Sequence, residues 1–296
     1  MRSYFDKLTL PFAGVLFALS FVPRVAAQTR PYFVTYDHYL EEPGSLELGV
    51  HSTFGTQRAA NDFLSYWVEA EYGVTGWWTT ELYLAGQSTF GNSTVFTGVR
   101  WENRLRPLKR EHWINPVLYV EFENVNGADK IMKDVVGHDV EADKAEPNAA
   151  LRREREREVE FKLILSSNYR GWNFSENIVA VKNLNNSPWE FGYAVGASRP
   201  LALKASAQRC SLCRENFVAG VEMYGGLGDR YHFGLRHTSH YLAPVVAWNL
   251  PSGMTLRISP GFGLNANSRR FLLRWSVSRE FAGFGPAVRR FLRGRR

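Results

Sequence analysis

Apolar and polar residues alternate along most of the chain, in segments of about ten residues separated by turn-forming residues from position 44 to position 281. Leu46, Leu48 and Val50 mark the first segment, and Phe271 and Leu273 open the last one. Side chains of a β-strand point to opposite faces with period two, so each segment predicts a strand with one apolar and one polar face. Roughly twelve strands are expected, and an even number is typical of bacterial single-chain membrane barrels.

The tenth segment is predicted to be long, from about residue 230 to 250. Tyr231, Phe233 and Leu235 share one phase of the alternation, whereas Leu242 and Val246 have the other. A bulge near residues 239–241 would explain this change of phase.

The stretch LRREREREVEFKLIL, residues 151 to 165, alternates strictly between arginine and glutamate before it becomes apolar. On a helix this spacing sets like charges four apart and opposite charges three apart, which gives mixed support. On a strand the arginines share a face with Val159 and Phe161, and the glutamates share the other face with Lys162. The pattern therefore favours a strand whose outer face runs from cationic to apolar.

The first 27 residues are predicted to be a cleaved secretory signal peptide. Arg2 and Lys7 give a basic start, residues 8–22 are apolar, and residues 25–27 are a small-residue cleavage site. No uninterrupted apolar stretch of about 18 residues follows, so no membrane helix is expected in the mature chain. An aromatic content of 14%, 25 glycines and a mean hydropathy of −0.28 fit a barrel, in which only alternate residues face lipid.

The net charge of +7 comes from the two ends of the chain. Between residues 28 and 281 there are 28 basic and 28 acidic side chains, so the sequence shows no nucleic-acid-binding surface. The expected fold class is all-β, an antiparallel up-and-down transmembrane β-barrel. We divide the chain into the signal peptide 1–27, an N-terminal periplasmic segment 28–43, the barrel 44–281 and a basic C-terminal tail 282–296, expected to be disordered.

Connection lengths give an independent check on the orientation of the barrel. With the amino terminus in the periplasm, tight turns are expected after strands two, six and ten, at residues 74–76, 169–171 and 251–253. The longest connection, residues 125–152, is then external, and its many polar residues predict a solvated loop. The acidic residues of this loop do not have the spacing of an EF-hand.

The tracts YGVTGWWTTELYL, TSHYLAPVVAWNLPSGMTLRISPGFGLN and RRFLLRWSVSREF resemble outer-membrane barrels of the transporter-like superfamily that includes proteins of the MetA pathway of phenol degradation. The resemblance implies location in the bacterial outer membrane and insertion by the barrel assembly machinery, which reads a last strand ending in an aromatic residue such as Phe281. It says little about substrate. The tail after Phe281 departs from the usual pattern.

If the apolar faces point to lipid, the polar faces place charged residues in the lumen, which suggests a porin-like channel for small solutes with acidic and basic walls. The alternative is that these side chains pair with one another and fill a narrow barrel. The residues predicted to line the pore are Glu69, Glu71, Glu81, Arg100, Glu102, Glu121, Glu123, Glu158, Glu160, Lys162, Glu222, Arg257, Arg270 and Arg274.

On the outer face of the arginine and glutamate stretch, Arg153, Arg155 and Arg157 precede the first apolar residues, at the height of lipopolysaccharide phosphates. Guanidinium groups suit phosphate, so contact with lipopolysaccharide is expected in addition to outer-membrane lipid.

Two other classes of function remain open. His237 and Ser239 form the His-x-Ser pattern of outer-membrane lipid hydrolases, such as the phospholipase and the lipid A deacylase, and by phase they would face lipid; they are weak catalytic candidates. A structural or adhesive barrel is the third class. Cys210 and Cys213 predict a disulfide-closed loop, and we expect no cofactor and no metal.

Overall fold

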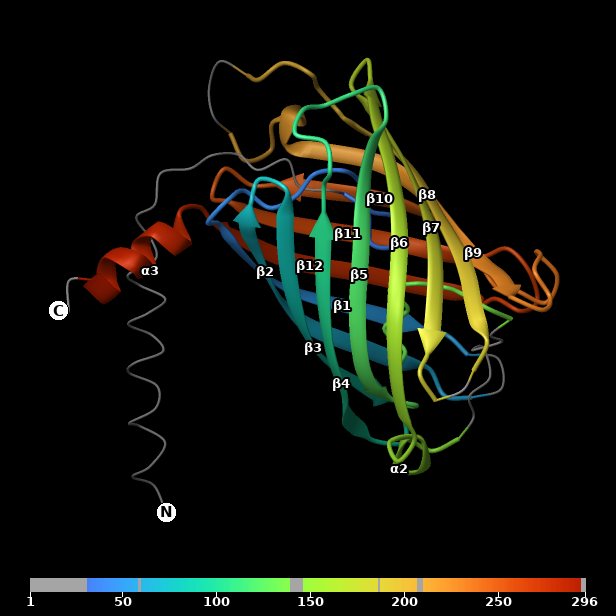
Figure 1. Ribbon diagram of the computed structural model, residues 1–296. Coiled ribbons are helices and arrows are strands. Elements are labelled where there is room, and N and C mark those ends of the chain that lie inside the picture. Colours follow the sequence, from blue (N-terminus) through green and yellow to red (C-terminus); the bar gives the residue numbers. More distant parts are fainter. Residues whose placement is uncertain (1–30, 58–59, 139–145, 186, 207–209, 294–296) are drawn as a thin grey trace.

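The computed structural model describes all residues except 1–30, 58–59, 139–145, 186, 207–209 and 294–296, so the predicted signal peptide lies outside the described residues. Twelve strands of the described part form one closed barrel (Figure 1). Its strands are β1 (Leu46–Gly55), β2 (Phe63–Thr75), β3 (Trp78–Thr89), β4 (Thr94–Leu105), β5 (Asn115–Asn126), β6 (Arg155–Tyr169), β7 (Trp172–Asn183), β8 (Trp189–Pro200), β9 (Phe217–Asp229), β10 (His240–Asn249), β11 (Met254–Gly263) and β12 (Phe271–Phe281).

Every strand pairs antiparallel with its neighbours in sequence, and β1 closes the barrel against β12, where Leu46 pairs with Phe281. The predicted all-β, up-and-down barrel is therefore confirmed. The turn between β6 and β7 contains only Arg170 and Gly171, which have φ values of 49° and 82°. Two successive residues with positive φ are characteristic of the tight hairpin turn whose twist matches that of the strands.

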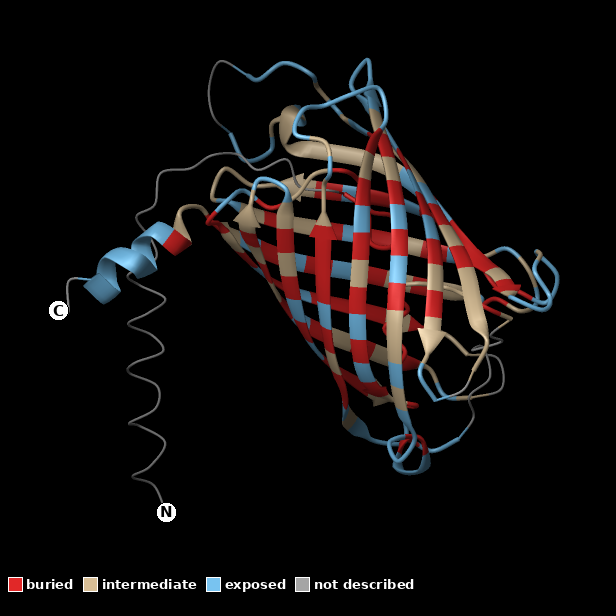
Figure 2. Ribbon diagram, in the orientation of Figure 1, coloured by how far each residue is buried: buried red, intermediate tan, exposed pale blue. Residues whose placement is uncertain are grey.

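The outer surface of the barrel is apolar. Along most strands buried residues alternate with intermediate or exposed ones, which gives the banding in Figure 2. Val50, Leu82, Trp101 and Ile178 each leave at least half of their surface exposed, and they belong to four different strands. An apolar surface that encircles a closed barrel is the surface of a membrane-spanning protein, because exposing such a large apolar area to water is unfavourable. None of the helices in the described residues is long and apolar enough to cross a membrane.

Aromatic side chains mark the end of the barrel at which β1 begins and β12 ends. Trp77, Trp113, Tyr169 and Trp172 are exposed in or beside the turns at this end. Trp113 and Tyr169 pack edge to face, with ring centroids 5.7 Å apart. Aromatic girdles form at both membrane–water interfaces of such barrels. The turns after β2, β6 and β10 lie at this end, and they are as short as the periplasmic turns of such barrels.

Two segments that are not strands fill the inside of the barrel. Residues 31–38, which the sequence analysis placed in a periplasmic segment, are buried and bonded to the lumen wall. Residues 127–133 of the connection between β5 and β6, predicted to be solvated, also turn inward, and Ala128 and Ile131 are buried. A lumen lined by charged groups offers both segments hydrogen-bond and ion-pair partners that local sequence does not reveal.

Two predicted local features differ in the structure. Residues 230–239 form a loop before β10 rather than a long strand with a bulge, because Asp229 Oδ1 accepts hydrogen bonds from the backbone N–H groups of Tyr231 and His232 and turns the chain. The basic tail is not disordered, since residues Phe284–Arg293 form helix α3. Short helices also occur at Asn148–Leu151 (α2) and Arg214–Asn216 (η3).

Candidate functional site

The lumen of the barrel is its candidate functional site. Most of the charged residues predicted to face inward are buried there: Glu69, Glu71, Glu81, Arg100, Glu102, Glu121, Glu123, Glu160, Lys162, Glu222, Arg257 and Arg274. Glu158 is half-buried near the outer end of β6 and accepts a hydrogen bond from Asn183. Strict alternation from the apolar outer face is what directs these side chains inward.

Arg270 is exposed, so the sequence-based placement of this residue in the lumen is corrected. It precedes the first residue of β12, where the alternation of the strand does not yet apply. Arg269 is the buried residue instead: its guanidinium lies 4.6 Å from the ring centroid of Phe63, and its Nη1 donates to Gln57 Oε1 at 2.8 Å.

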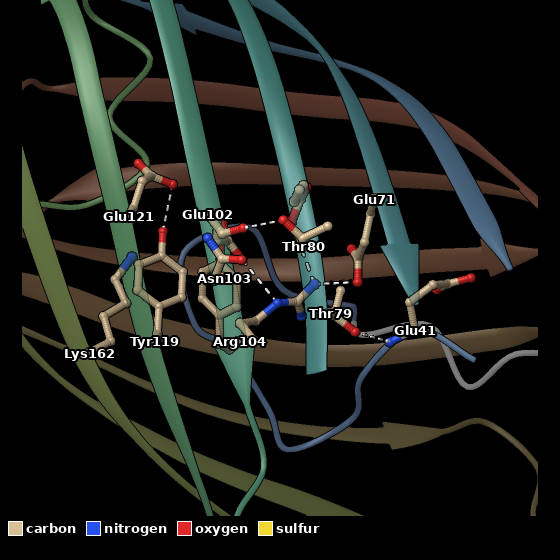
Figure 3. Close-up of polar contacts among 12 residues, drawn as sticks. Glu41, Glu71, Thr79, Thr80, Glu102, Asn103, Arg104, Tyr119, Glu121 and Lys162 are labelled. Atoms are coloured by element: carbon tan, nitrogen blue, oxygen red, sulfur yellow. Dashed lines mark hydrogen bonds and ion pairs between the residues drawn. The ribbon is translucent and has the colours of Figure 1, made fainter. Parts of the chain in front are cut away.

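Two arginines of β4 organise the acidic wall. Arg104, which the sequence analysis missed, bonds to Glu71 and lies 2.9 Å from a carboxylate oxygen of Glu102 (Figure 3). Arg100 binds Glu123 through Nε at 2.7 Å and Asp129 through Nη2 at 2.8 Å. If either arginine moved away, its carboxylate partners would be left as buried charges without a counter-charge, which is energetically costly. The contacts therefore hold this part of the wall in one arrangement.

The N-terminal segment is held inside the lumen through its backbone. The Glu222 carboxylate accepts hydrogen bonds from the N–H groups of Phe33, Val34 and Thr35, at 3.2, 2.9 and 2.9 Å. Asn177 binds both backbone groups of Tyr36, accepting from its N–H at 2.6 Å and donating to its carbonyl at 2.8 Å. The segment is thus bound as a peptide ligand would be, by side chains of β7 and β9.

The connection between β5 and β6 enters the lumen from the opposite end. Lys133 Nζ lies between Glu102 and Glu121, at 2.7 and 2.6 Å from their carboxylate oxygens, and 3.9 Å from the ring centroid of Tyr83. Arg274 on the far wall donates to the carbonyl of Met132 at 2.6 Å. Burial by itself would lower the pKa of Lys133, but the two carboxylates outweigh it and raise that pKa, so the ammonium stays charged.

The two segments meet at Glu102. Its carboxylate accepts hydrogen bonds from Tyr36 of the N-terminal segment at 3.0 Å, from Tyr83 of the wall at 2.5 Å and from Lys133 at 2.7 Å. The space that remains beside Tyr36 and Lys133 has a volume of only about 10 Å³. Because both segments contact Glu102 at this point, we call Tyr36, Tyr83, Glu102 and Lys133 the constriction.

A larger cavity lies on the outer side of the constriction. It is enclosed by the inward part of the β5–β6 connection, which we call the inward loop, and by residues of strands β4 to β8 and β10. Its volume is about 300 Å³. Among the residues that the structure describes, six carboxylates and three basic groups line it: Glu123, Asp129, Asp134, Glu156, Glu158 and Glu190 against Arg100, Lys130 and Lys133. We call it the acidic vestibule. A cavity with this balance of charge attracts small cations and repels anions.

Carboxylate oxygens of Glu121, Glu123 and Glu160 lie within 4.8 Å of one another, close enough to hold a metal ion. Each of them already has a cationic partner, however. Lys133 binds Glu121, Arg100 binds Glu123, and Lys162 pairs with Glu160. The positive charge that a metal would supply is therefore provided by side chains.

The remaining sequence-predicted residues lie outside the lumen wall. Arg153, Arg155 and Arg157 are exposed at the outer end of β6. Cys210 and Cys213 form a disulfide in the connection between β8 and β9. His237 is exposed in the loop before β10, with a φ of 58°.

The phase of the alternation predicts that Ser239 faces lipid, and this prediction is wrong. It is buried, lines the acidic vestibule, and donates its hydroxyl to the carbonyl of Asn267 at 2.8 Å. The loop that replaces the predicted strand turns Ser239 inward while His237 points to solvent. The arrangement of nucleophile and base that hydrolysis needs is therefore not formed by these two residues.

No protein-family model matches this chain, and no curated protein sequence does. Among solved structures, an outer membrane channel from Pseudomonas putida F1 is similar over 83% of this chain and 98% of that one, with 12% identity and a TM-score of 0.53. A KdgM porin covers 78% of this chain with 6% identity and a TM-score of 0.43, and LpxR from Salmonella typhimurium covers 79% with 10% identity and a TM-score of 0.40; they match over 98% and 99% of their own lengths. At these identities the likeness is one of fold.

Proposed function

We propose that the protein is an outer-membrane channel for small polar solutes, that it prefers cations, and that the two segments in the lumen control passage through it. The observation that carries this proposal is the acidic vestibule, a polar cavity within a barrel whose outer surface is apolar. A barrel that served only as a structural anchor has no need of a charged cavity. The fold shared with the P. putida channel supports the same conclusion.

Passage depends on the constriction. Cations collect in the vestibule because its carboxylates outnumber its basic groups. They move further when the inward loop withdraws Lys133 from Glu102 and Glu121, which leaves two carboxylates for the passing cation. The Lys133 ammonium thus occupies, in the closed channel, the place that a permeating cation takes in the open one.

The finer assignments belong to this proposal as well. Resemblance of three sequence tracts to the transporter-like superfamily of the MetA pathway supports a role in solute passage, with export to the bacterial outer membrane and insertion by the barrel assembly machinery. Arg153, Arg155 and Arg157 are exposed on the outward side of β6, as contact with lipopolysaccharide phosphates requires. On the same face, Phe161 begins the apolar surface.

Planar-bilayer recording of the refolded protein tests the channel. We expect discrete conductance steps, and in a salt gradient a reversal potential of the sign that cation preference gives. Neutralising vestibule carboxylates in the variant Glu156→Gln/Glu158→Gln/Glu190→Gln should move the reversal potential toward zero. Glu176→Gln removes the same kind of charge from an exposed site on β7 and should leave it unchanged. Persistent electrical silence of correctly folded protein overturns the channel, and equal reversal potentials in all three proteins overturn the role of the vestibule.

A further inference from the structure

Helix α3 separates its apolar and cationic residues onto two faces. Phe284, Ala287, Val288, Phe291 and Leu292 follow the i, i+3, i+4, i+7, i+8 spacing that places side chains on one side of a helix. Between them, Arg289, Arg290 and Arg293 fall on the other side. A helix with this pattern normally packs its apolar face against a protein core.

The barrel does not supply such a core. The beginning of α3 is fixed to the barrel, since the N–H of Gly285 donates to the carbonyl of Gly44 at 2.8 Å and a side chain at position 285 would collide with Tyr72. Beyond that point the helix stands away from the wall (Figure 1). Phe291 and Leu292 remain 59% and 60% exposed.

The position of α3 identifies the surroundings of its apolar face. The helix follows Phe281, the last residue of β12, at the same end of the barrel as the exposed girdle residues Trp77, Trp113 and Trp172. Such girdles lie at the boundary between lipid and water. A helix that leaves the barrel at this level extends along the periplasmic surface of the membrane.

The charge of the tail specifies the lipid. Residues 282–296 contain five arginines and neither aspartate nor glutamate. Arginine binds phosphate with two parallel hydrogen bonds, and helices with a basic face and an apolar face lie in the interface of membranes that contain anionic lipid. We propose that α3 is an interfacial helix that binds anionic phospholipids of the periplasmic leaflet, with its apolar face among the acyl chains and its arginines on the phosphates. The inference rests on the outer-membrane location in the proposed function but not on conduction.

A fluorescent label on either face of α3 tests the proposal in the full chain. The two native cysteines are joined in a disulfide, so a cysteine introduced at Leu292 or Arg290 can be labelled selectively with an environment-sensitive dye. In vesicles of phosphatidylethanolamine and phosphatidylglycerol we expect the label of Leu292→Cys to emit at shorter wavelength than that of Arg290→Cys. Iodide in the water should quench it several-fold less. Val288→Cys gives a second apolar-face position if Leu292→Cys folds poorly.

The same labels test the anionic component. Replacing phosphatidylglycerol by phosphatidylcholine, or changing all three helix arginines to glutamine, should increase iodide quenching at position 292. Equal quenching at positions 290 and 292 overturns the proposal, as does protection at 292 that is independent of both lipid charge and arginines. Co-sedimentation with isolated peptidoglycan through the arginines, together with equal quenching, assigns the tail to the cell wall instead. Conductance of the same protein is measured separately, so failure of α3 to bind lipid is distinguishable from failure of the channel.

Discussion

Glu222 is the residue at which the N-terminal segment can be released most selectively. Its carboxylate accepts three backbone N–H groups of the segment, while the rest of its strand contributes to the barrel wall. The change Glu222→Ala removes these three bonds and leaves the N–H groups of Phe33, Val34 and Thr35 buried without that acceptor. The barrel hydrogen bonds of β9 are backbone bonds and remain.

The expected effect is large because hydrogen bonds to a charged group are worth about 1.5–3 kcal/mol each. The three bonds share one carboxylate and are not fully additive, so we expect the segment to lose about 4 kcal/mol of its preference for the lumen. This corresponds to a roughly thousandfold change in the ratio of bound to released segment, since about 1.4 kcal/mol is a factor of ten. A state that is rare in the native protein then becomes frequent.

Planar-bilayer recording reports this change as longer or more frequent openings of higher conductance. Limited proteolysis should also cut the N-terminal segment of the variant faster than that of the native protein. Glu158→Ala is the matched control, because it removes a carboxylate from the lumen without touching the N-terminal segment. If Glu222→Ala and Glu158→Ala behave alike in both assays, Glu222 does not hold the segment and the reasoning is refuted.

Three further predictions concern stability and lipid contact. Lys133→Met should lower stability by about 3–5 kcal/mol, because it leaves Glu102 and Glu121 without their shared cation; thermal unfolding measures this, and a loss that Glu121→Gln does not partly restore would contradict it. Burial, with the carboxylates of Glu71, Glu47 and Glu280 nearby, raises the pKa of Glu41 to about 10. The stability that this group contributes is therefore fully present below about pH 4.5 and is lost as pH rises toward 10. Glu41→Gln should accordingly be more stable than the native protein at pH 8 and similar to it at pH 4. Equal unfolding midpoints of the variant and the native protein at both pH values would argue against this. The third change replaces the exposed residues Arg153, Arg155 and Arg157 by serine. It should weaken lipopolysaccharide binding and lower the temperature of unfolding in lipopolysaccharide without preventing assembly. No change in either property would exclude the contact.

The wall of the barrel could be predicted from the sequence because its determinants are local. Period-two alternation specifies which face of each strand is apolar, and short turns such as Arg170-Gly171 specify where the chain reverses. Twelve strands, antiparallel order and the direction of most charged side chains follow from these two signals alone. Arg270 shows the limit of these signals, because it lies one residue before the start of β12, where the alternation does not apply.

The filling of the lumen could not be predicted in the same way, because it depends on contacts between distant parts of the chain. The segment around Tyr36 has no periodicity of its own, and its partners Asn177 and Glu222 lie more than a hundred residues away in sequence. Two signals in the sequence could have indicated it. Residues 32–36, YFVTY, are too apolar for a periplasmic segment, and Lys130 and Lys133 enclose an apolar pair in a loop beside an acidic wall.

The seam between β1 and β12 has a consequence for biogenesis. Leu46 pairs with Phe281, so the contact that completes the cylinder joins nearly the two extremes of the folded chain, and contacts of such long range form late because their entropic cost is high. The N-terminal segment directly precedes β1 and is therefore attached to a strand that forms its final pairing late. Its docking onto β7 and β9 before sealing would hold β1 near its final partner. Weakening the docking contacts is then expected to delay maturation of the nascent cylinder as well as to alter conduction.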